Sequence, residues 1–190
     1  MSLRIIGGAF KGRSLKTPKV STTRPTQGML REAVFNICQN VIEGARFLDL
    51  FAGSGAMGIE AISRGAGQAT FVEQNRQAIA CIKENIAAFE IEGQTQIIAL
   101  DAVRALHSLA KQGSKFDLVY VDPPYDIPVT PLIDAIIPLL AAESLLFVEE
   151  RHSPKTPIQP YVPPQLILKD SRRFGIALLH QYRFSGNQEL

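Results

Sequence analysis

The residues with the clearest chemical potential are Asp122, Pro123, Pro124 and Tyr125, which directly follow the apolar run LVYV. Each proline lacks an N–H donor, fixes its own φ angle and biases the residue before it towards an extended backbone. The segment therefore presents a carboxylate and main-chain carbonyls, all acceptors, followed by a ring that can stack. Such a set suits the exocyclic amine of a nucleobase, which offers two N–H donors in the plane of the ring. A plain turn is the alternative interpretation.

An aryl amine is a weak nucleophile because its lone pair is delocalised into the ring. Acceptors on both N–H groups favour its rehybridisation, and the Asp122 carboxylate would stabilise the charge that develops when a methyl group arrives. Holding the nitrogen in line with the methyl donor lowers the barrier by several kcal/mol more. A cysteine attack on a ring carbon is disfavoured because neither Cys38 nor Cys81 follows a predicted strand. These residues therefore predict methylation of an amine.

A second group of residues predicts the methyl donor. Gly53, Gly55 and Gly58 form G-x-G-x-x-G between a predicted strand and a predicted helix. Glu73 follows Gly53 by twenty residues, where a carboxylate can bind ribose hydroxyls. Asp49 stands four residues before Gly53, and its charge suits the ammonium group of S-adenosylmethionine but would repel a pyrophosphate. No Gly-Lys-Ser/Thr follows the glycines, which disfavours ATP as a phosphoryl donor. S-adenosylmethionine is therefore favoured over NAD.

A sheet must position these residues. Short apolar segments at 46–51, 69–73, 95–100, 116–122 and 144–150 alternate with helical patterns at 56–65, 75–90, 102–113 and 129–141. This alternation predicts a doubly wound α/β fold with a mostly parallel sheet. Residues 165–184 hold two more strand candidates, antiparallel at the sheet edge, so seven strands are expected. Ligands of such sheets bind beyond the carboxyl ends of the strands, where Asp101 and Ala102 could meet an adenine edge.

The first 31 residues carry seven cations and no acidic residue, although the net charge of the whole chain is only +2. Apolar and basic residues alternate around Gly7-Gly8 and Lys11-Gly12, which predicts an ordered β-hairpin, and residues 30–41 have helical apolar spacing. A basic ordered element suggests a polyanion, most simply nucleic acid, whereas a solvated tail is the alternative. The residues expected to contact RNA are Arg4, Lys11, Arg13, Lys16, Arg24 and Arg31.

Length and composition predict a single domain over residues 1–190, with a basic hairpin arm at 1–24 and a Rossmann-like core at 25–190. No apolar run approaches the roughly 20 residues needed to span a bilayer, and no signal peptide opens the chain. A cytoplasmic monomer without a membrane partner is therefore expected. Cys38 and Cys81 have no metal or redox spacing and are predicted to be reduced core residues. The histidines form no ligand set either, so no metal is expected.

Three segments in a fixed order resemble one family. The stretches RPTQGMLREAVFNI, LDLFAGSGAMGIEAISRGA and DPPY are similar to those of the RsmD (YhhF) group of bacterial methyltransferases. The resemblance covers nearly the whole chain, from RIIGG to the closing strand pair. It implies a class I methyltransferase fold and transfer of a methyl group from S-adenosylmethionine to the N2 amine of one guanine in 16S ribosomal RNA. The implied partner is the small ribosomal subunit or an assembly intermediate of it.

The resemblance also implies roles for the matching residues. The catalytic loop would be Asp122 to Tyr125, and the segment with Arg24, Pro25, Thr26 and Arg31 would close over the methionine end of the cofactor. Glu73 would hold the ribose, and Asp101 with Ala102 would border the adenine. The other implied cofactor contacts are Asp49, Phe51, Ala52, Gly53, Ser54, Gly55 and Thr26. This chain departs from the family at Gly28-Met29, where an acidic–basic pair is usual.

Other functions are compatible with some of these residues. Adenine-N6 DNA methyltransferases share DPPY, but they usually carry an inserted recognition region, and only 66 residues separate Gly55 from Asp122. A non-catalytic RNA-binding protein with a relic pocket would not bind S-adenosylmethionine. A nicotinamide dehydrogenase is disfavoured because nothing at the fourth strand suits hydride transfer. Asp122 and Tyr125 would hold guanine or adenine about equally well, and only the resemblance selects guanine.

Overall fold

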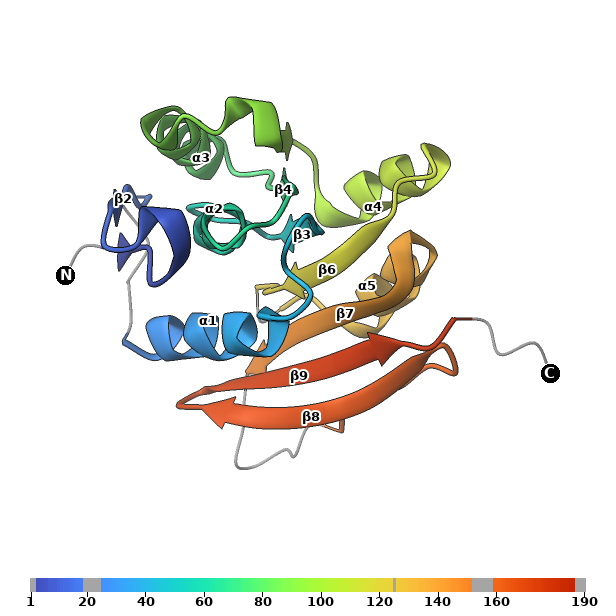
Figure 1. Cartoon of the computed structure of the whole chain (residues 1–190). Coiled ribbons are helices and arrows are strands. Elements are labelled where there is room, and N and C mark those ends of the chain that lie inside the picture. Colours follow the sequence, from blue (N-terminus) through green and yellow to red (C-terminus); the bar gives the residue numbers. More distant parts are fainter. Residues whose placement is uncertain (1–2, 19–24, 125, 152–158, 187–190) are drawn as a thin grey trace.

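The computed structural model describes residues 3–18, 25–124, 126–151 and 159–186 (Figure 1). Arg24 and Tyr125 lie outside the described residues, as does the side chain of Thr26. The helices are α1 (Pro25–Cys38), α2 (Ala56–Ser63), α3 (Arg76–Phe89), α4 (Ala102–Lys111) and α5 (Thr130–Ile136), with 3-10 turns η1 (Gly8–Phe10), η2 (Glu92–Gln94) and η3 (Ile137–Leu139). The strands are β1 (Leu3–Arg4), β2 (Ser14–Leu15), β3 (Arg46–Leu50), β4 (Gln68–Val72), β5 (Thr95–Ile98), β6 (Phe116–Val121), β7 (Leu140–Arg151), β8 (Leu166–Phe174) and β9 (Ala177–Phe184).

Seven strands form the main sheet in the order β5-β4-β3-β6-β7-β9-β8. The strands from β5 to β7 run parallel, and β9 pairs antiparallel with both β7 and β8. The predicted fold class and the predicted N-terminal hairpin of β1 and β2 are confirmed. The two closing strands form the predicted antiparallel pair at the sheet edge, with β8 outermost.

The chain from 129 to 151 also differs from the prediction of a helix to 141 and a strand from 144. Helix α5 ends at Ile136, one 3-10 turn follows, and β7 already begins at Leu140. Pro138 lies in that turn and has no N–H to donate within a continuing helix, which explains the early end.

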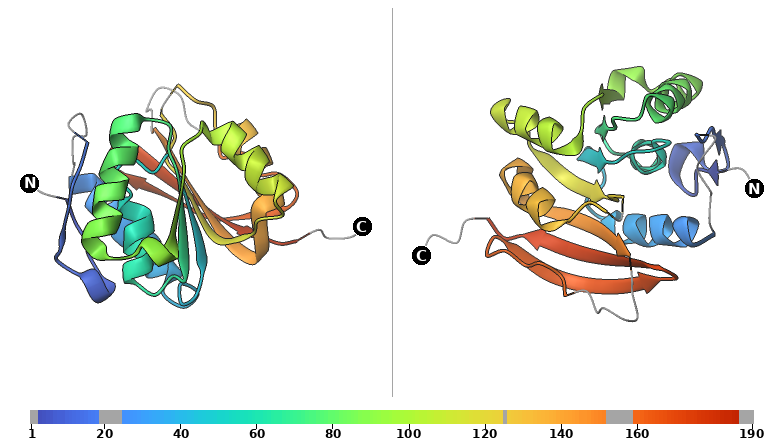
Figure 2. Two further views of the ribbon diagram at one scale, coloured as in Figure 1. Left: turned by 90° about the horizontal axis from the view of Figure 1, so that it is seen from above. Right: turned by 180° about the vertical axis from the view of Figure 1, so that it is seen from behind.

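Helices cover both faces of the sheet (Figure 2). Helices α1, α2 and α3 pack on one face together with the hairpin residues Ile5 and Leu15, and α4 and α5 pack on the other. Both faces of the central strands are therefore buried, which is why their sequences read as apolar runs. Cys38 and Cys81 are buried free thiols, as predicted.

Residues of the central strands alternate between the two faces. Leu48 and Leu50 of β3 pack with α4 and α5, whereas Phe47 packs with α1 to α3. Asp49 and its register partner Tyr120 of β6 point to the face that α1, α2 and α3 cover. The polar side chains of Asp49 and Tyr120 therefore lie on the same side of the sheet as α1 and α2.

The hairpin packs tightly on α2 instead of extending as an arm. The N–H groups of Ile6 and Gly7 donate to the two oxygens of the buried Glu60 carboxylate at 2.8 and 2.7 Å. Gly8 has a φ of 75°, and a Cβ there would lie 1.8 Å from the Ser63 carbonyl oxygen. Only glycine allows this approach of the hairpin to the end of α2.

Candidate active site

Two cavities lie side by side at the carboxyl ends of the parallel strands. The inner cavity has a volume of about 230 Å³, and its wall includes Asp49, Tyr120, Asp122 and Glu149. The outer cavity, of about 530 Å³, is lined by Phe51, Val72, Glu73, Gln74, Asn75, Leu100, Ala102, Asp122 and Pro124. Phe51 and Asp122 belong to both walls, so one elongated ligand could occupy both cavities. This is the sheet edge at which the sequence places a ligand.

The loop after β3 forms part of both walls. Phe51 has a φ of 66°, in the left-handed region that costs free energy for a residue with a side chain. The N–H groups of Phe51 and Ala52 both donate to the Val72 carbonyl at 3.1 Å, which holds the loop against β4. Gly55, with a φ of 77°, begins α2. Ala52, Gly53 and Ser54 line the inner cavity, whereas Gly55 has the structural role of starting the helix.

Glu73 is fixed at the wall of the outer cavity by three backbone donors. Its Oε2 accepts the Gly53 N–H at 2.9 Å, and its Oε1 accepts the N–H groups of Gln74 and Asn75 at 2.9 and 2.8 Å. A carboxylate has about four acceptor positions, so Oε2 retains capacity for a ligand hydroxyl. The predicted Gly53–Glu73 spacing therefore brings the loop and the carboxylate into direct contact.

Asp49 is a buried carboxyl group that could bind a cationic ligand. It is 2% exposed, and its Oδ2 accepts the Gly58 N–H at 3.0 Å. Burial raises the pKa of Asp49 to about 8, and the charges of Asp122 and Glu73 act in the same direction. A ligand cation in the inner cavity would favour the ionised form.

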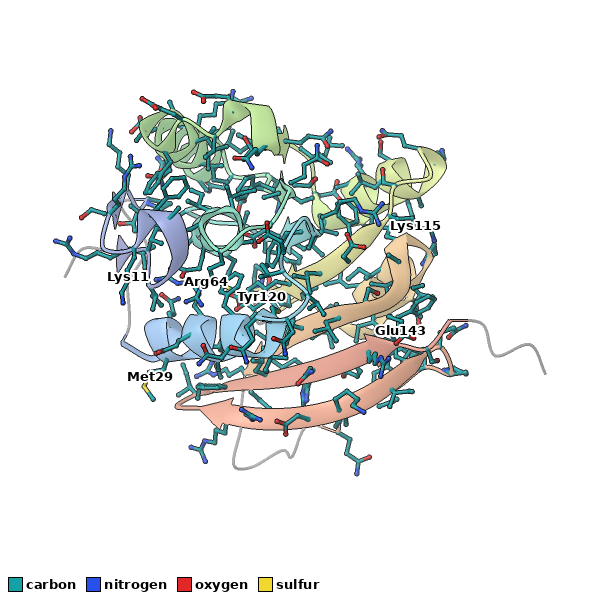
Figure 3. The ribbon with its side chains drawn as sticks, viewed as in Figure 1. Lys11, Met29, Arg64, Lys115, Tyr120 and Glu143 are labelled. Carbon is teal, nitrogen blue, oxygen red and sulfur yellow. The ribbon has the colours of Figure 1, made fainter. Side chains whose placement is uncertain are left out.

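Asp122 stands next to a second carboxylate, Glu149 of β7. Burial raises the pKa of Asp122 to about 7, and the charge of Glu149 contributes to the shift. The buried hydroxyl of Tyr120, at the centre of the molecule in Figure 3, donates to Glu149 Oε2 at 2.7 Å. Burial also raises the pKa of Glu149, although the Tyr120 hydrogen bond opposes this. Pro123 is buried and Pro124 is exposed at the outer cavity, while Tyr125 lies outside the described residues.

Asp101, which was predicted to border the adenine, lines neither of the two cavities. Its side chain caps α4 by accepting the Arg104 N–H at 3.0 Å, and it pairs with the Arg104 side chain at 3.3 Å. Ala102 lines the outer cavity, and the neighbouring Leu100 lines it with a 40% exposed apolar side chain. The signal for Leu100 in the sequence was its position at the end of the third predicted strand, directly before Asp101.

Further wall residues, among them four polar ones beside the predicted carboxylates, were not predicted. Gln74 and Asn75 follow Glu73 and line the outer cavity, and Tyr120 and Glu149 line the inner one. The signal for Glu149 was its position at the end of the fifth strand segment, SLLFVEE, because the same rule had selected residues at the ends of the first four.

The predicted RNA contact Arg31 has to be corrected. Its side chain is buried, Nη2 donates to the Arg4 carbonyl at 2.5 Å, and Nε lies 3.5 Å from Glu60 Oε2. Burial lowers the pKa of Arg31, and the charge of Glu60 opposes this shift. This guanidinium is therefore not one of the exposed cations of the hairpin. Arg31 instead lines the inner cavity, and its Nε has no hydrogen-bond partner among the described residues.

The other predicted RNA contacts within the described residues lie on the hairpin surface. Arg4 donates to the Gly12 carbonyl, Arg13 lies over the Phe89 ring at 4.1 Å, and Lys16 pairs with Glu84 at 2.8 Å. Lys11 is exposed at the outer end of the hairpin (Figure 3). All four cations belong to the hairpin segment, which packs on α2 and α3 and whose Leu3 lines the inner cavity.

Within the described residues, no cluster of histidine, cysteine, aspartate or glutamate side chains is suited to a metal ion. No described helix has the length and apolar character needed to cross a membrane.

Comparison with known proteins gives one consistent relationship. Residues 3–183 match the family described as Conserved hypothetical protein 95. The chain is 44% identical over 123 residues to YlbH of Bacillus subtilis (strain 168). These residues span 65% of this chain and 67% of that protein. It is 38% identical over 153 residues to the Ribosomal RNA small subunit methyltransferase D of Escherichia coli (strain K12), spanning 77% and 74% of the two chains. The solved structure of YhhF from Escherichia coli superposes with a TM-score of 0.85 at 33% identity, covering 98% of this chain and 100% of that one.

A family match over residues 3–183, together with relatives of this identity and coverage, shows that the chain belongs to the Conserved hypothetical protein 95 family, which includes the ribosomal RNA small subunit methyltransferase D proteins.

Proposed function

We propose that this chain transfers a methyl group from S-adenosylmethionine to the N2 amine of one guanine in 16S ribosomal RNA. The observation that carries the proposal is a row of carboxylates on adjacent strands, with Glu73 in the outer cavity and Asp49 and Asp122 in the inner one. Such carboxylates suit ribose hydroxyls, a cationic ligand and amine donors, respectively. The name of the Escherichia coli relative supports RNA of the small subunit as the acceptor.

The described residues fit the cofactor in three parts. Leu100 and Ala102 offer an apolar wall to the adenine, and Glu73 would accept hydrogen bonds from the ribose. In the inner cavity the Asp49 carboxylate would hold the ammonium group, directly or through water. The guanidinium of Arg31, which lines the inner cavity, would donate to the methionine carboxylate. When bound, the cofactor supplies a methyl group made electrophilic by the sulfonium charge.

Asp122 would act on the acceptor amine in two ways. Its carboxylate accepts one amine N–H, which turns the nitrogen lone pair towards the methyl group and stabilises the charge that develops. The Asp122 carboxylate would take the surplus proton of the amine once its nitrogen has gained the methyl group that the cofactor would supply. A pKa of about 7 suits such a base near neutral pH. The buried ring of Pro123 restricts the backbone beside Asp122.

The test is to incubate the protein with S-adenosylmethionine carrying a labelled methyl group and small ribosomal subunits from a strain that lacks the gene. Mass spectrometry of the digested RNA should find the label in N2-methylguanosine at one position. Naked 16S RNA and duplex DNA are compared in parallel. Label in N6-methyladenine of DNA would replace the proposal by a DNA methyltransferase, and label in no nucleic acid would overturn it.

Asp49→Asn is expected to weaken cofactor binding and to stabilise the protein. The amide can still accept the Gly58 N–H, but it cannot neutralise a cation, so isothermal titration should show an S-adenosylmethionine Kd higher by about 10- to 100-fold. The folded pKa of Asp49 is about 8 and lies above its unfolded value, so folding of the wild type becomes less favourable as pH rises from about 4 to 8.

Asparagine stays neutral at every pH, so the Asp49→Asn advantage in the free energy of unfolding should grow over this range to several kcal/mol at about pH 8. Urea unfolding of both proteins without ligand at pH 5 and pH 8 measures it. A variant that is less stable than the wild type at pH 8 would contradict the assigned cost of the buried charge.

The pH dependence of methyl transfer should have an acid limb. With saturating S-adenosylmethionine, kcat/KM for RNA should rise with pH along a limb whose midpoint lies near about pH 7 and level off above it, because Asp122 must be ionised to accept the amine proton. Glu149 and Asp49 are carboxylates on the same cavity wall, and Arg31 and Tyr120 also face it. The Glu149 charge raises the Asp122 pKa, so Glu149→Gln should move the limb to lower pH. If the acid limb of Glu149→Gln lies at the same pH as that of the wild type, the limb does not report the titration of Asp122.

A further inference from the structure

Glu149 is a cavity-lining carboxylate that the proposed reaction has not used. It lies near the carboxyl end of β7, directly after Val148, and Asp122 directly follows Val121, the parallel register partner of Val148. The two carboxylates are therefore neighbours on adjacent strands, and both line the inner cavity. Their proximity is unfavourable while the cavity is empty, because Glu149 disfavours ionisation of Asp122.

The order of the strands places Glu149 on the acceptor side of the reaction. Neighbouring strands β4, β3, β6 and β7 contribute Glu73, Asp49, Asp122 and Glu149 in that order. If Glu73 holds the ribose and Asp122 holds the reacting amine, Glu149 lies beyond Asp122 on the side away from the cofactor. This is the side that the rest of the nucleobase must occupy.

We infer that Glu149 accepts the N1–H of the target guanine while Asp122 accepts an N2–H, an inference that rests on the proposed function. The two carboxylates together would then select guanine. Guanine carries these two donors next to each other on one edge. Adenine and cytosine carry an acceptor nitrogen on the Watson–Crick edge next to their amine, and its lone pair would face the Glu149 carboxylate. A site built from such partners rejects analogues that leave a buried polar group unpaired.

The Tyr120 hydroxyl supports this role for Glu149. It donates to Oε2 at 2.7 Å and fixes the carboxylate, which leaves Oε1 for a ligand. Tyr120 belongs to β6 and is buried, so the orientation comes from the sheet and not from a loop. A guanine edge with two donors would also relieve the repulsion between Glu149 and Asp122.

The test uses 16S RNA in which the mapped guanine is replaced by 2-aminopurine through ligation of a synthetic oligoribonucleotide. This base keeps the amine but has an acceptor at N1. We expect the wild type to methylate it at least about 100-fold more slowly than guanine, in kcat/KM. Glu149→Gln should lower kcat/KM for guanine by about 10- to 100-fold. It should also reduce the ratio of kcat/KM for guanine to that for 2-aminopurine, because the glutamine amide can donate to N1 of 2-aminopurine.

Glu150→Gln is the matched control. It removes the same charge one residue further along β7, where Glu150 faces His180 at 3.2 Å on the other side of the strand. This variant should keep the wild-type preference for guanine. Thermal unfolding and S-adenosylmethionine titration of all variants separate a change of preference from a loss of fold or cofactor binding.

The outcomes distinguish the inference from the function on which it rests. Methylation of guanine and 2-aminopurine at similar rates by the wild type would overturn the role of Glu149 and leave the methyltransferase assignment standing. An unchanged preference in Glu149→Gln would do the same. No methylation of guanine by the wild type would overturn the proposed function itself.

Discussion

Replacing Asp122 with alanine is expected to lower kcat for methyl transfer by about 10²- to 10³-fold while the Kd for S-adenosylmethionine stays within about threefold of the wild type. The variant loses the acceptor that orients the amine and takes its proton. Glu73 and Asp49, which would hold the cofactor, keep their backbone hydrogen bonds to Gly53 and Gly58. Removal of one negative charge near Asp49 even favours its ionised form. Single-turnover methylation of ribosomal subunits measures the rate, and isothermal titration measures the binding.

Asp126→Ala is the matched control for Asp122→Ala, because it removes the same charge from an exposed position of the same loop. It should change the rate of methyl transfer by less than about threefold. Asp122→Asn completes the series, since the amide oxygen can accept an N–H but cannot take a proton near neutral pH. Full activity of Asp122→Ala would remove the catalytic role of this carboxylate, and equal losses at positions 122 and 126 would point to loop structure instead.

The predictable part of the site follows from a property of parallel sheets. Their strands all end at one edge, so local sequence patterns that locate strand ends also locate Asp49, Glu73 and Asp122. The contact between Glu73 and the Gly53 N–H follows from the length of the α2 crossover and the pairing of β3 with β4. No long-range information was needed to place these three carboxylates together.

The residues that sequence patterns did not place depend on side-chain direction and long-range partners. The basic first segment predicts Arg31 as an RNA contact and the family resemblance places it near the methionine end of the cofactor, whereas the structure has it on the same side of α1 as Val34 and Phe35, where it meets Glu60 of α2 in the interior. That helical spacing was visible, but the compensating carboxylate was 29 residues away in the sequence. Asp101 was expected at the adenine, but capping α4 is the stronger local demand on a carboxylate at a helix N-terminus.

Glu60→Ala is expected to lower the free energy of unfolding by about 3–5 kcal/mol, because it removes one partner of a buried charge network. Glu60 is fully buried and accepts the N–H groups of Ile6 and Gly7 and, at 2.8 Å, Nε of Arg64, whose guanidinium lies beside the hairpin (Figure 3). Alanine would leave these donors and the Arg31 guanidinium in the interior without a compensating carboxylate. Urea unfolding measures the loss, and amide hydrogen exchange of residues 5–15 should show that the hairpin opens first.

Glu84→Ala is the control for this prediction, because Glu84 also ties the hairpin to a helix, but from the surface. Its side chain is 57% exposed and pairs with Lys16, which is 66% exposed, so its loss should cost no more than about 0.5 kcal/mol. Equal effects of the two substitutions would show that hydrophobic contacts of Ile5 and Leu15, and not the buried carboxylate, hold the hairpin. Because Arg31 contacts both Glu60 and the inner cavity, Glu60→Ala should also weaken S-adenosylmethionine binding, whereas Glu84→Ala should not. The hairpin and the proposed cofactor site would then depend on one buried carboxylate.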